Sequence, residues 1–182
     1  MVYIMLAEGF EEVEALTVVD IVRRAGIEAN TVSITSDNEV TGAHGIVVKA
    51  DEIMADVDLR NSGLVVLPGG MPGALNLRND ATLCAVFKER AEKERPIAAI
   101  CAAPYILGEL GILRGKMATC YPGFEDKLLG ATYTAAMVER DGNIITAKGP
   151  AAAMAFGFAI VELLGSVYKA NEVAEGMLYK LQ

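Results

Sequence analysis

The residue with the clearest potential for chemistry is Cys101, which follows the short apolar run at 97–100, bounded by Pro96. Such a run predicts a buried strand, and Pro104 suits the first turn of a helix. Cys101 would therefore lie where the carboxyl end of a strand meets the N-terminus of a helix. The unpaired amide groups and the positive dipole end at such a place favour a thiolate over a thiol. The pattern is typical of a nucleophile elbow, a strand-to-helix turn that presents a reactive side chain.

A second interpretation of Cys101 stays open at this level. Free cysteine is among the most buried residue types and usually behaves as a small hydrophobic side chain. The stretch alone does not decide between a nucleophile and a packing residue. The other two cysteines, Cys84 and Cys120, are expected to be structural, although Cys120 lies near a turn and could be a second oxidisable thiol.

An acidic residue that could act with a nucleophile is Glu14, in a helix that the sequence predicts from the acidic segment 8–12 to Ala25. Carboxylates in the first turn of a helix interact favourably with its dipole. Glu14 shares a helical face with Val18 and Ile21, so it lies on a largely apolar stripe. On the residues alone, a solvated glutamate near a helix N-terminus is favoured over an acid that belongs to a site.

The glycine pair Gly69 and Gly70 follows the buried apolar strand expected at 64–67. Glycine lets the backbone come close to a bound group and point amide N–H groups at it, so this turn could supply half of an oxyanion hole. Glycines after strands are common, so the signal is weak alone. The sequence completes neither a GxGxxG nor a P-loop pattern here, and no nucleotide cofactor is expected.

A metal site is not expected from this sequence. His44 is the only histidine, and the three cysteines lie at no metal-ligand spacing. We expect His44 to be a surface residue in a loop rather than a catalytic base, because no neighbouring residue in the sequence would orient it. The odd number of cysteines predicts reduced thiols.

Length and composition favour one cytoplasmic domain over residues 1–182. A net charge of −8 without a basic cluster argues against nucleic-acid binding. The longest charge-free apolar stretch, 151–161, is shorter than the roughly 20 residues that span a bilayer, so no membrane association is expected. The first residues lack a basic region and meet Glu8 almost at once, which predicts a strand rather than a signal peptide.

Strands and helices alternate along the predicted chain. Besides the strands already given, single strands are predicted at 2–7, 27–34, 116–122 and 132–137. A hairpin is predicted at 138–146, with its turn at Asp141 and Gly142, and a short pair of strands is predicted within 39–49. Further helices are predicted at 79–94, 103–110 and 151–164, and an amphipathic segment begins at Asn171. The helix at 79–94 is expected to be exposed, with a solvated charged face at 88–95.

This alternation predicts a mainly parallel sheet that is covered by helices on both faces and binds ligands at the carboxyl ends of its strands. Cys101, the Gly69–Gly70 turn and the start of the Glu14 helix all fall at such ends. We therefore expect them to meet at one edge of the sheet.

The stretches at 7–14, 66–70 and 98–104 resemble the ThiJ/PfpI superfamily, and within it the DJ-one-like branch of parkinsonism-associated deglycases. The similarity covers nearly the whole chain and includes 20–27 and 148–150. It implies a flavodoxin-like α/β fold, a three-layer sandwich with a nucleophile elbow, and a homodimer.

The resemblance also implies roles for the two chemical groups. Cys101 would be the reactive elbow cysteine, and Glu14 the carboxyl group that hydrogen-bonds its sulfur or an oxidised sulfinate. The amides of the elbow would lower the pKa of the thiol, whereas a buried Glu14 would tend to be protonated and act as acid or base.

The remaining site residues implied by the resemblance would bind substrate. Gly70 and Ala102 would supply the amides of the oxyanion site, next to Gly69. Arg24 matches an arginine that in relatives lies near the dimer interface and the site.

Two positions depart from related sequences. Many relatives carry a histidine where this chain has Tyr121, and a phenol is a poor base at neutral pH, which puts a histidine proton shuttle in doubt. His44 could replace it only if its loop folded over the site. The peptidase-like branch has a histidine directly after the nucleophile, whereas this chain has Ala102, so peptidase activity is not expected.

Two functions follow from the resemblance. In the first, Cys101 attacks small reactive carbonyls such as methylglyoxal, and Glu14 moves protons so that a 2-hydroxy acid forms without glutathione or another cofactor; removal of glycation adducts is a related activity. In the second, the chain is a redox-sensing stress protein or holdase whose Cys101 oxidises to a sulfinate.

Overall fold

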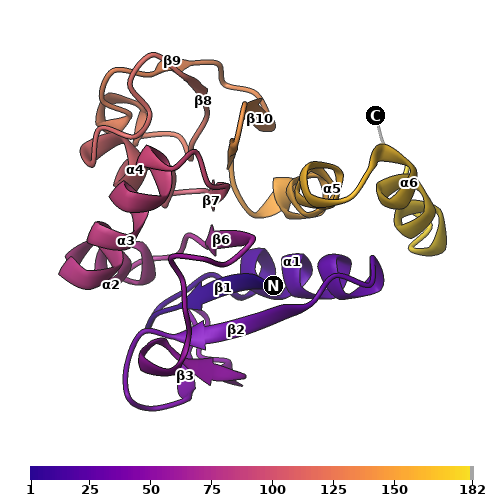
Figure 1. Ribbon diagram of the computed structural model, residues 1–182, viewed down its shortest axis with the longest axis horizontal. Helices are drawn as coiled ribbons and strands as arrows, with labels where there is room; N and C mark the ends of the chain where they lie inside the picture. Colours follow the sequence, from indigo (N-terminus) through magenta and orange to yellow (C-terminus); the bar gives the residue numbers. More distant parts are fainter. Residues whose placement is uncertain (181–182) are drawn as a thin grey trace.

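A seven-stranded sheet runs through the middle of the computed structural model, which describes residues 1–180 (Figure 1). Residues 181 and 182, the end of the predicted domain, lie outside the described residues. Across the sheet the strands are β10 (Val138–Asp141), β11 (Ile144–Ala147), β7 (Ile97–Ile100), β6 (Leu64–Leu67), β1 (Val2–Leu6), β2 (Ala29–Ser33) and β5 (Glu52–Ile53). Every neighbouring pair is parallel except β10 and β11, so the prediction of a mainly parallel sheet is confirmed.

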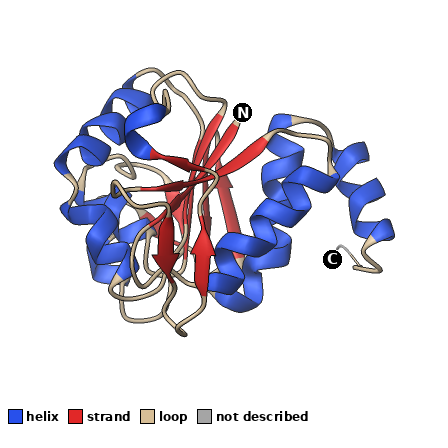
Figure 2. Cartoon of the chain, turned by 90° about the horizontal axis from the view of Figure 1, so that it is seen from below, coloured by secondary structure: helices blue, strands red, loops and turns tan. Residues whose placement is uncertain are grey.

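Helices cover both faces of the sheet, and each face has its own apolar core (Figure 2). Successive side chains of a strand point to opposite faces, so Ile4 and Val66 join one core whereas Met5 and Val65 join the other. The first core is closed by α1 (Glu12–Arg24), α5 (Ala153–Leu164) and α6 (Val167–Gly176), and the second by α2 (Gly73–Asn79), α3 (Ala81–Glu92) and α4 (Pro104–Glu109). The flavodoxin-like three-layer sandwich is therefore confirmed.

Several shorter elements of residues 1–180 lie outside the seven-stranded sheet and its six helices. They are the antiparallel pair β3 (Glu39–Thr41) and β4 (Val47–Lys49), the parallel pair β8 (Met117–Ala118) and β9 (Thr132–Tyr133), and 3-10 turns at Met54–Asp56, Glu125–Lys127 and Pro150–Ala152. The predicted strand pair within 39–49 and the hairpin at Asp141–Gly142 are confirmed. Within residues 1–180, no helix has the length and apolar character that a membrane crossing needs.

The helix predicted at 79–94 forms as α3, Ala81–Glu92, and the preceding helix α2 ends at Asn79. Asp80 between them is extended and caps α3 by accepting a hydrogen bond from the Leu83 amide at 2.7 Å. Arg90, placed on a solvated face by the sequence, is fully buried. Its guanidinium donates to the carbonyl oxygens of Leu59 at 2.6 Å and Pro96 at 2.7 Å, so it joins the segments that lead into β6 and β7. Burial lowers the pKa of Arg90 to about 10.

We expect Arg90→Met to lower the free energy of unfolding by about 3 kcal/mol or more, because it leaves several buried carbonyl groups without a donor. Urea unfolding measures this change. Lys88→Ala, an exposed change in the same helix, is the matched control and should cost less than about 0.5 kcal/mol. Equal effects of the two substitutions would contradict the structural role of Arg90.

Candidate active site

The backbone of Cys101 is strained at the turn between β7 and α4. Its φ is +64°, a left-handed conformation that costs a residue other than glycine on the order of 1 kcal/mol. Two backbone hydrogen bonds hold it: the Cys101 amide donates to the Ala147 carbonyl at 2.9 Å, and the Tyr121 amide donates to the Cys101 carbonyl at 2.8 Å. Because α4 begins at Pro104, this is the geometry of a strand-to-helix elbow.

Glu14 lies beside this elbow and is fully buried, so the prediction of a solvated glutamate is wrong. The helical face that it shares with Val18 and Ile21 packs into the core, and both of those side chains are also fully buried. Its Oε2 accepts a hydrogen bond from the Gly69 amide at 2.7 Å. Among residues 1–180, no hydrogen-bond donor meets its Oε1.

Gly69 is the point at which the two groups converge. A Cβ atom at this position would lie 2.6 Å from the Cys101 Cβ, 2.8 Å from the Glu14 Oε2 and 3.1 Å from the Cys101 Sγ. Only glycine leaves room for this approach. The structure thus brings together Cys101, Glu14 and the glycine turn, from three elements that are far apart in the sequence.

The electrostatics of Glu14 follow from its burial, which raises its pKa to about 7. Hydrogen bonds from Gly69 and Cys101 oppose the rise, and the charge of Glu11 adds to it. A carboxyl group that titrates near neutral pH can both accept and return a proton, which is what general acid–base chemistry requires.

The thiol of Cys101 has a pKa raised to about 12, first by burial and then by the charge of Glu14. The amides of Ala102 and Gly70 hydrogen-bond the sulfur and act in the opposite direction. The elbow amides act in the expected direction and lower the pKa of the thiol, but burial outweighs them. Cys101 needs a base to take its proton, and Glu14 is the group beside it.

Burial of Glu14 has a consequence for stability. Its pKa is about 7 when folded against an ordinary 4.5, so the folded state holds the proton that the unfolded state releases between these values. We expect the free energy of unfolding to fall by about 3 kcal/mol as the pH rises through this window. Glu14→Gln should lack this part of the fall in pH-dependent urea unfolding, and an identical fall in both proteins would refute the assignment.

Tyr121 adjoins the elbow through its backbone, while its side chain is 46% exposed. Its ring packs against Gly149, where a Cβ would lie 3.2 Å from the Tyr121 Cδ2. The backbone of Tyr121 therefore contacts Cys101, whereas its ring contacts Gly149.

His44 is exposed, as predicted, and the residues that orient it lie far away in the sequence, at the start of α1. Its Nδ1 lies 2.8 Å from the Glu12 Oε2 and 3.7 Å from the Glu11 Oε2, and these hydrogen-bonding and charge effects raise its pKa. Ligand atoms of the three residues lie within 4.8 Å of one another, a spacing that could hold a metal ion. Glu12 already uses both oxygens, because its Oε1 accepts from the amides of His44 and Ile46. The cluster connects the loop between β3 and β4 to the start of α1. It could not be predicted because its residues are far apart in the sequence.

The structure does not bring Arg24 to Cys101 within one chain. Arg24 ends α1 and pairs with Asp20, Nε to Oδ2 at 2.8 Å. Ten residues separate it from Glu14, which amounts to roughly 15 Å along a helix.

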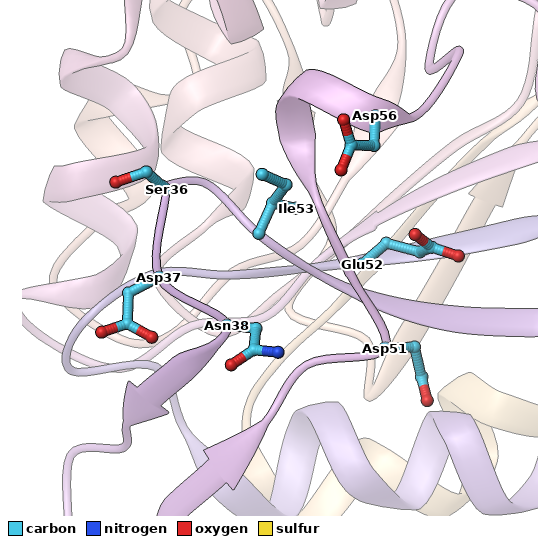
Figure 3. A pocket seen from close by; sticks show the side chains of 7 residues that line it. All are labelled: Ser36, Asp37, Asn38, Asp51, Glu52, Ile53 and Asp56. Atoms are coloured by element: carbon cyan, nitrogen blue, oxygen red, sulfur yellow. The ribbon is translucent and has the colours of Figure 1, made fainter.

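A pocket of about 550 Å³ lies elsewhere, at the β5 edge of the sheet. Figure 3 shows its lining, with the carboxylates of Asp37, Asp51 and Asp56 spread around it rather than gathered at one point. The Asp51 Oδ2 already accepts a hydrogen bond from the Arg23 Nη2 at 2.8 Å. Because β5 is four strands from β7 in the sheet, this pocket is roughly 19 Å from Cys101 and is not part of the elbow site.

Comparison with known proteins identifies a family for this chain. Residues 1–163 match the model of the DJ-1/PfpI family. The Parkinson disease protein 7 homolog of Danio rerio is 34% identical over 97% of this chain and 96% of its own. Protein DJ-1 homolog B of Arabidopsis thaliana is 39% identical over 95% of this chain, which spans only 40% of that protein's length. The chain likewise spans 46% of protein DJ-1 homolog A of the same plant.

A solved structure agrees with the fold. The oxidized DJ-1 of Toxoplasma gondii aligns with a TM-score of 0.94 at 34% identity, over 99% of this chain and 98% of that one.

Proposed function

Because this chain belongs to the DJ-1/PfpI family, we propose that it is a cysteine-dependent, glutathione-independent glyoxalase acting on small reactive carbonyls such as methylglyoxal. The observation that carries the proposal is the pairing of Cys101 with a buried carboxyl group, Glu14, whose pKa is about 7. Removal of early glycation adducts is a related activity of the same site.

In the proposed reaction, the Cys101 sulfur bonds to the aldehyde carbon of methylglyoxal while Glu14 takes the thiol proton. The aldehyde oxygen accepts hydrogen bonds from the amides of Gly70 and Ala102 and is then protonated, which gives a hemithioacetal. A proton then moves from the former aldehyde carbon to the neighbouring carbon through an enediol, with Glu14 as its carrier, and leaves a thioester. Water cleaves the thioester, releases lactate and returns the thiol.

The direct test is the formation of lactate from methylglyoxal by the native chain without glutathione. Turnover above the uncatalysed rate supports the proposal. Its absence would overturn it.

Tyr121 offers a further prediction on the same reaction. A histidine at this position would provide a base next to the elbow that the phenol does not, so Tyr121→His should raise kcat for lactate formation at neutral pH, by about tenfold. Tyr121→Phe is the matched control and should leave kcat near the native value. A lower kcat in Tyr121→His would refute the idea that proton transfer is limited by the tyrosine.

The second candidate function is a redox-responsive stress protein in which two peroxide molecules oxidise Cys101 to a sulfinate and two water molecules are released. A protonated Glu14 beside the sulfur would donate a hydrogen bond to the sulfinate, which supports this candidate, as does the relation to DJ-1 homologues, which suggest a stress-response protein. Mass spectrometry after mild peroxide treatment tests it. Failure to find a selective gain of two oxygen atoms on Cys101 would count against it.

We propose the following setting for either function. Proteins of this family are commonly dimeric, and we expect a cytoplasmic homodimer of a single 1–182 domain that binds neither nucleic acid nor membrane. The substrate would be a small aldehyde or ketoaldehyde, with no cofactor. Sedimentation equilibrium measures the oligomeric state.

A further inference from the structure

A pocket of about 200 Å³ adjoins the elbow on the side of β11. Its walls include Tyr121, Pro122, Met137, Lys148, Pro150 and Ala151. Two of the walls are tied to the backbone of Cys101. Ala147, which accepts the hydrogen bond from the Cys101 amide, directly precedes Lys148, and the Tyr121 amide donates to the Cys101 carbonyl. These contacts place the pocket beside the Cys101 backbone, about one strand spacing, or ~4.8 Å, from β7, although Cys101 is not itself among the residues that line it.

The lining of this pocket is almost entirely apolar. Lys148 is the one charged residue among its walls within the described chain, and its Nζ lies 3.4 Å from the Ala135 carbonyl oxygen. Tyr121 presents its ring to the pocket next to Gly149. Among residues 1–180 no carboxylate lines the space, and the mainly apolar lining suits an apolar substituent.

The size of the pocket indicates how large that substituent is. An apolar protein cavity of about 150 Å³ is large enough to bind benzene. The pocket here therefore has room for a phenyl ring or a branched alkyl group. It shares Met137 and Ala151 with a second pocket of about 430 Å³ along α5, so larger groups could extend into that space.

We propose that this pocket is a subsite for the apolar substituent of the substrate, so that the chain prefers α-ketoaldehydes carrying an aryl or branched alkyl group to glyoxal, which carries none. This inference rests on the proposed function, since the aldehyde carbon would bond to the Cys101 sulfur and leave the ketone substituent to enter the pocket. Tyr121 and Met137 are then specificity-determining residues rather than proton carriers.

The test separates the subsite from the catalysis. Cys101 is alkylated with phenacyl chloride or with chloroacetone, two chloroketones that differ in a phenyl and a methyl group, and each rate is divided by the rate with glutathione. Cys101→Ser shows which alkylation occurs at this thiol. We expect the normalised alkylation rate of the native chain to be about tenfold or more higher with phenacyl chloride than with chloroacetone.

Ala151→Leu fills the pocket from an exposed position and should remove the preference for phenacyl chloride. Ala85→Leu, on the exposed side of α3, is the matched control and should keep the preference. Equal normalised rates for the two reagents in the native chain, or an unchanged preference in Ala151→Leu, would overturn the subsite.

Turnover is then compared for phenylglyoxal and glyoxal. A higher kcat/KM for phenylglyoxal supports the subsite and the proposed function together. An alkylation preference without turnover of either compound supports the subsite and overturns the proposed function. Turnover of both compounds at equal kcat/KM overturns the subsite and leaves the proposed function standing.

Discussion

Cys101→Ser is expected to lower kcat/KM for lactate formation from methylglyoxal at least about a thousandfold, to the limit of detection. Serine is close to cysteine in size, so the elbow and its hydrogen bonds to Ala147 and Tyr121 should persist. The hydroxyl group is much harder to deprotonate than a thiol, and Glu14, with a pKa of about 7, is too weak a base for it. The loss would therefore come from the nucleophile and not from the fold. Initial rates of lactate formation without glutathione measure it.

The control for this substitution is Cys84→Ser, because the Cys84 thiol is also largely buried but lies on α3, away from the elbow. It should retain kcat/KM within about threefold of native, and both variants should show native thermal unfolding. Activity that survives Cys101→Ser would contradict the role of Cys101 as nucleophile.

Glu14→Gln is expected to lower kcat/KM by about a hundredfold to ten-thousandfold, the usual contribution of a general acid–base group. Glutamine has the same shape, and its side-chain oxygen can still accept the hydrogen bond from the Gly69 amide. It cannot take the thiol proton. In the native chain, kcat/KM should rise as the pH passes through about 7, because the carboxylate is the active form, and the variant should lose this rise.

A matched control for the pH dependence is Glu11→Gln. The charge of Glu11 helps to raise the pKa of Glu14, so this variant should keep the rise in kcat/KM but move it to lower pH. A native profile that is flat between pH 6 and 8, or a rise that survives in Glu14→Gln, would show that Glu14 is not the base.

Much of the fold could be predicted because its central strands are short apolar runs, and β6 and β7 are followed at once by Pro68 and Cys101. The runs at 64–67 and 97–100 became β6 and β7 with the predicted bounds. The edge strand β5 could not be found, since it consists of only Glu52 and Ile53 and pairs on one side. Arg90 reads as a surface residue in the sequence, and only the carbonyl groups of distant segments explain its burial.

The candidate site could be predicted in its position more readily than in its electrostatics. Parallel strands end at one edge, so Cys101 and the Gly69–Gly70 turn had to lie near each other once the sheet was inferred. The burial of Glu14 and the raised pKa of Cys101 depend on packing between α1 and the strand ends, which no local sequence pattern predicts. For the same reason, the contact between His44 and Glu12 was not predicted.

The most direct test of the Cys101–Glu14 pair is the pH dependence of Cys101 alkylation by iodoacetamide, in the native chain and in Glu14→Gln. This measurement needs no assumption about the substrate. If Glu14 takes the thiol proton, the native rate rises with an inflection near pH 7, and in Glu14→Gln that inflection is absent and alkylation at neutral pH is slower. The same inflection in both proteins, or a native rate that rises only above pH 8 as for an ordinary thiol, would contradict the pairing.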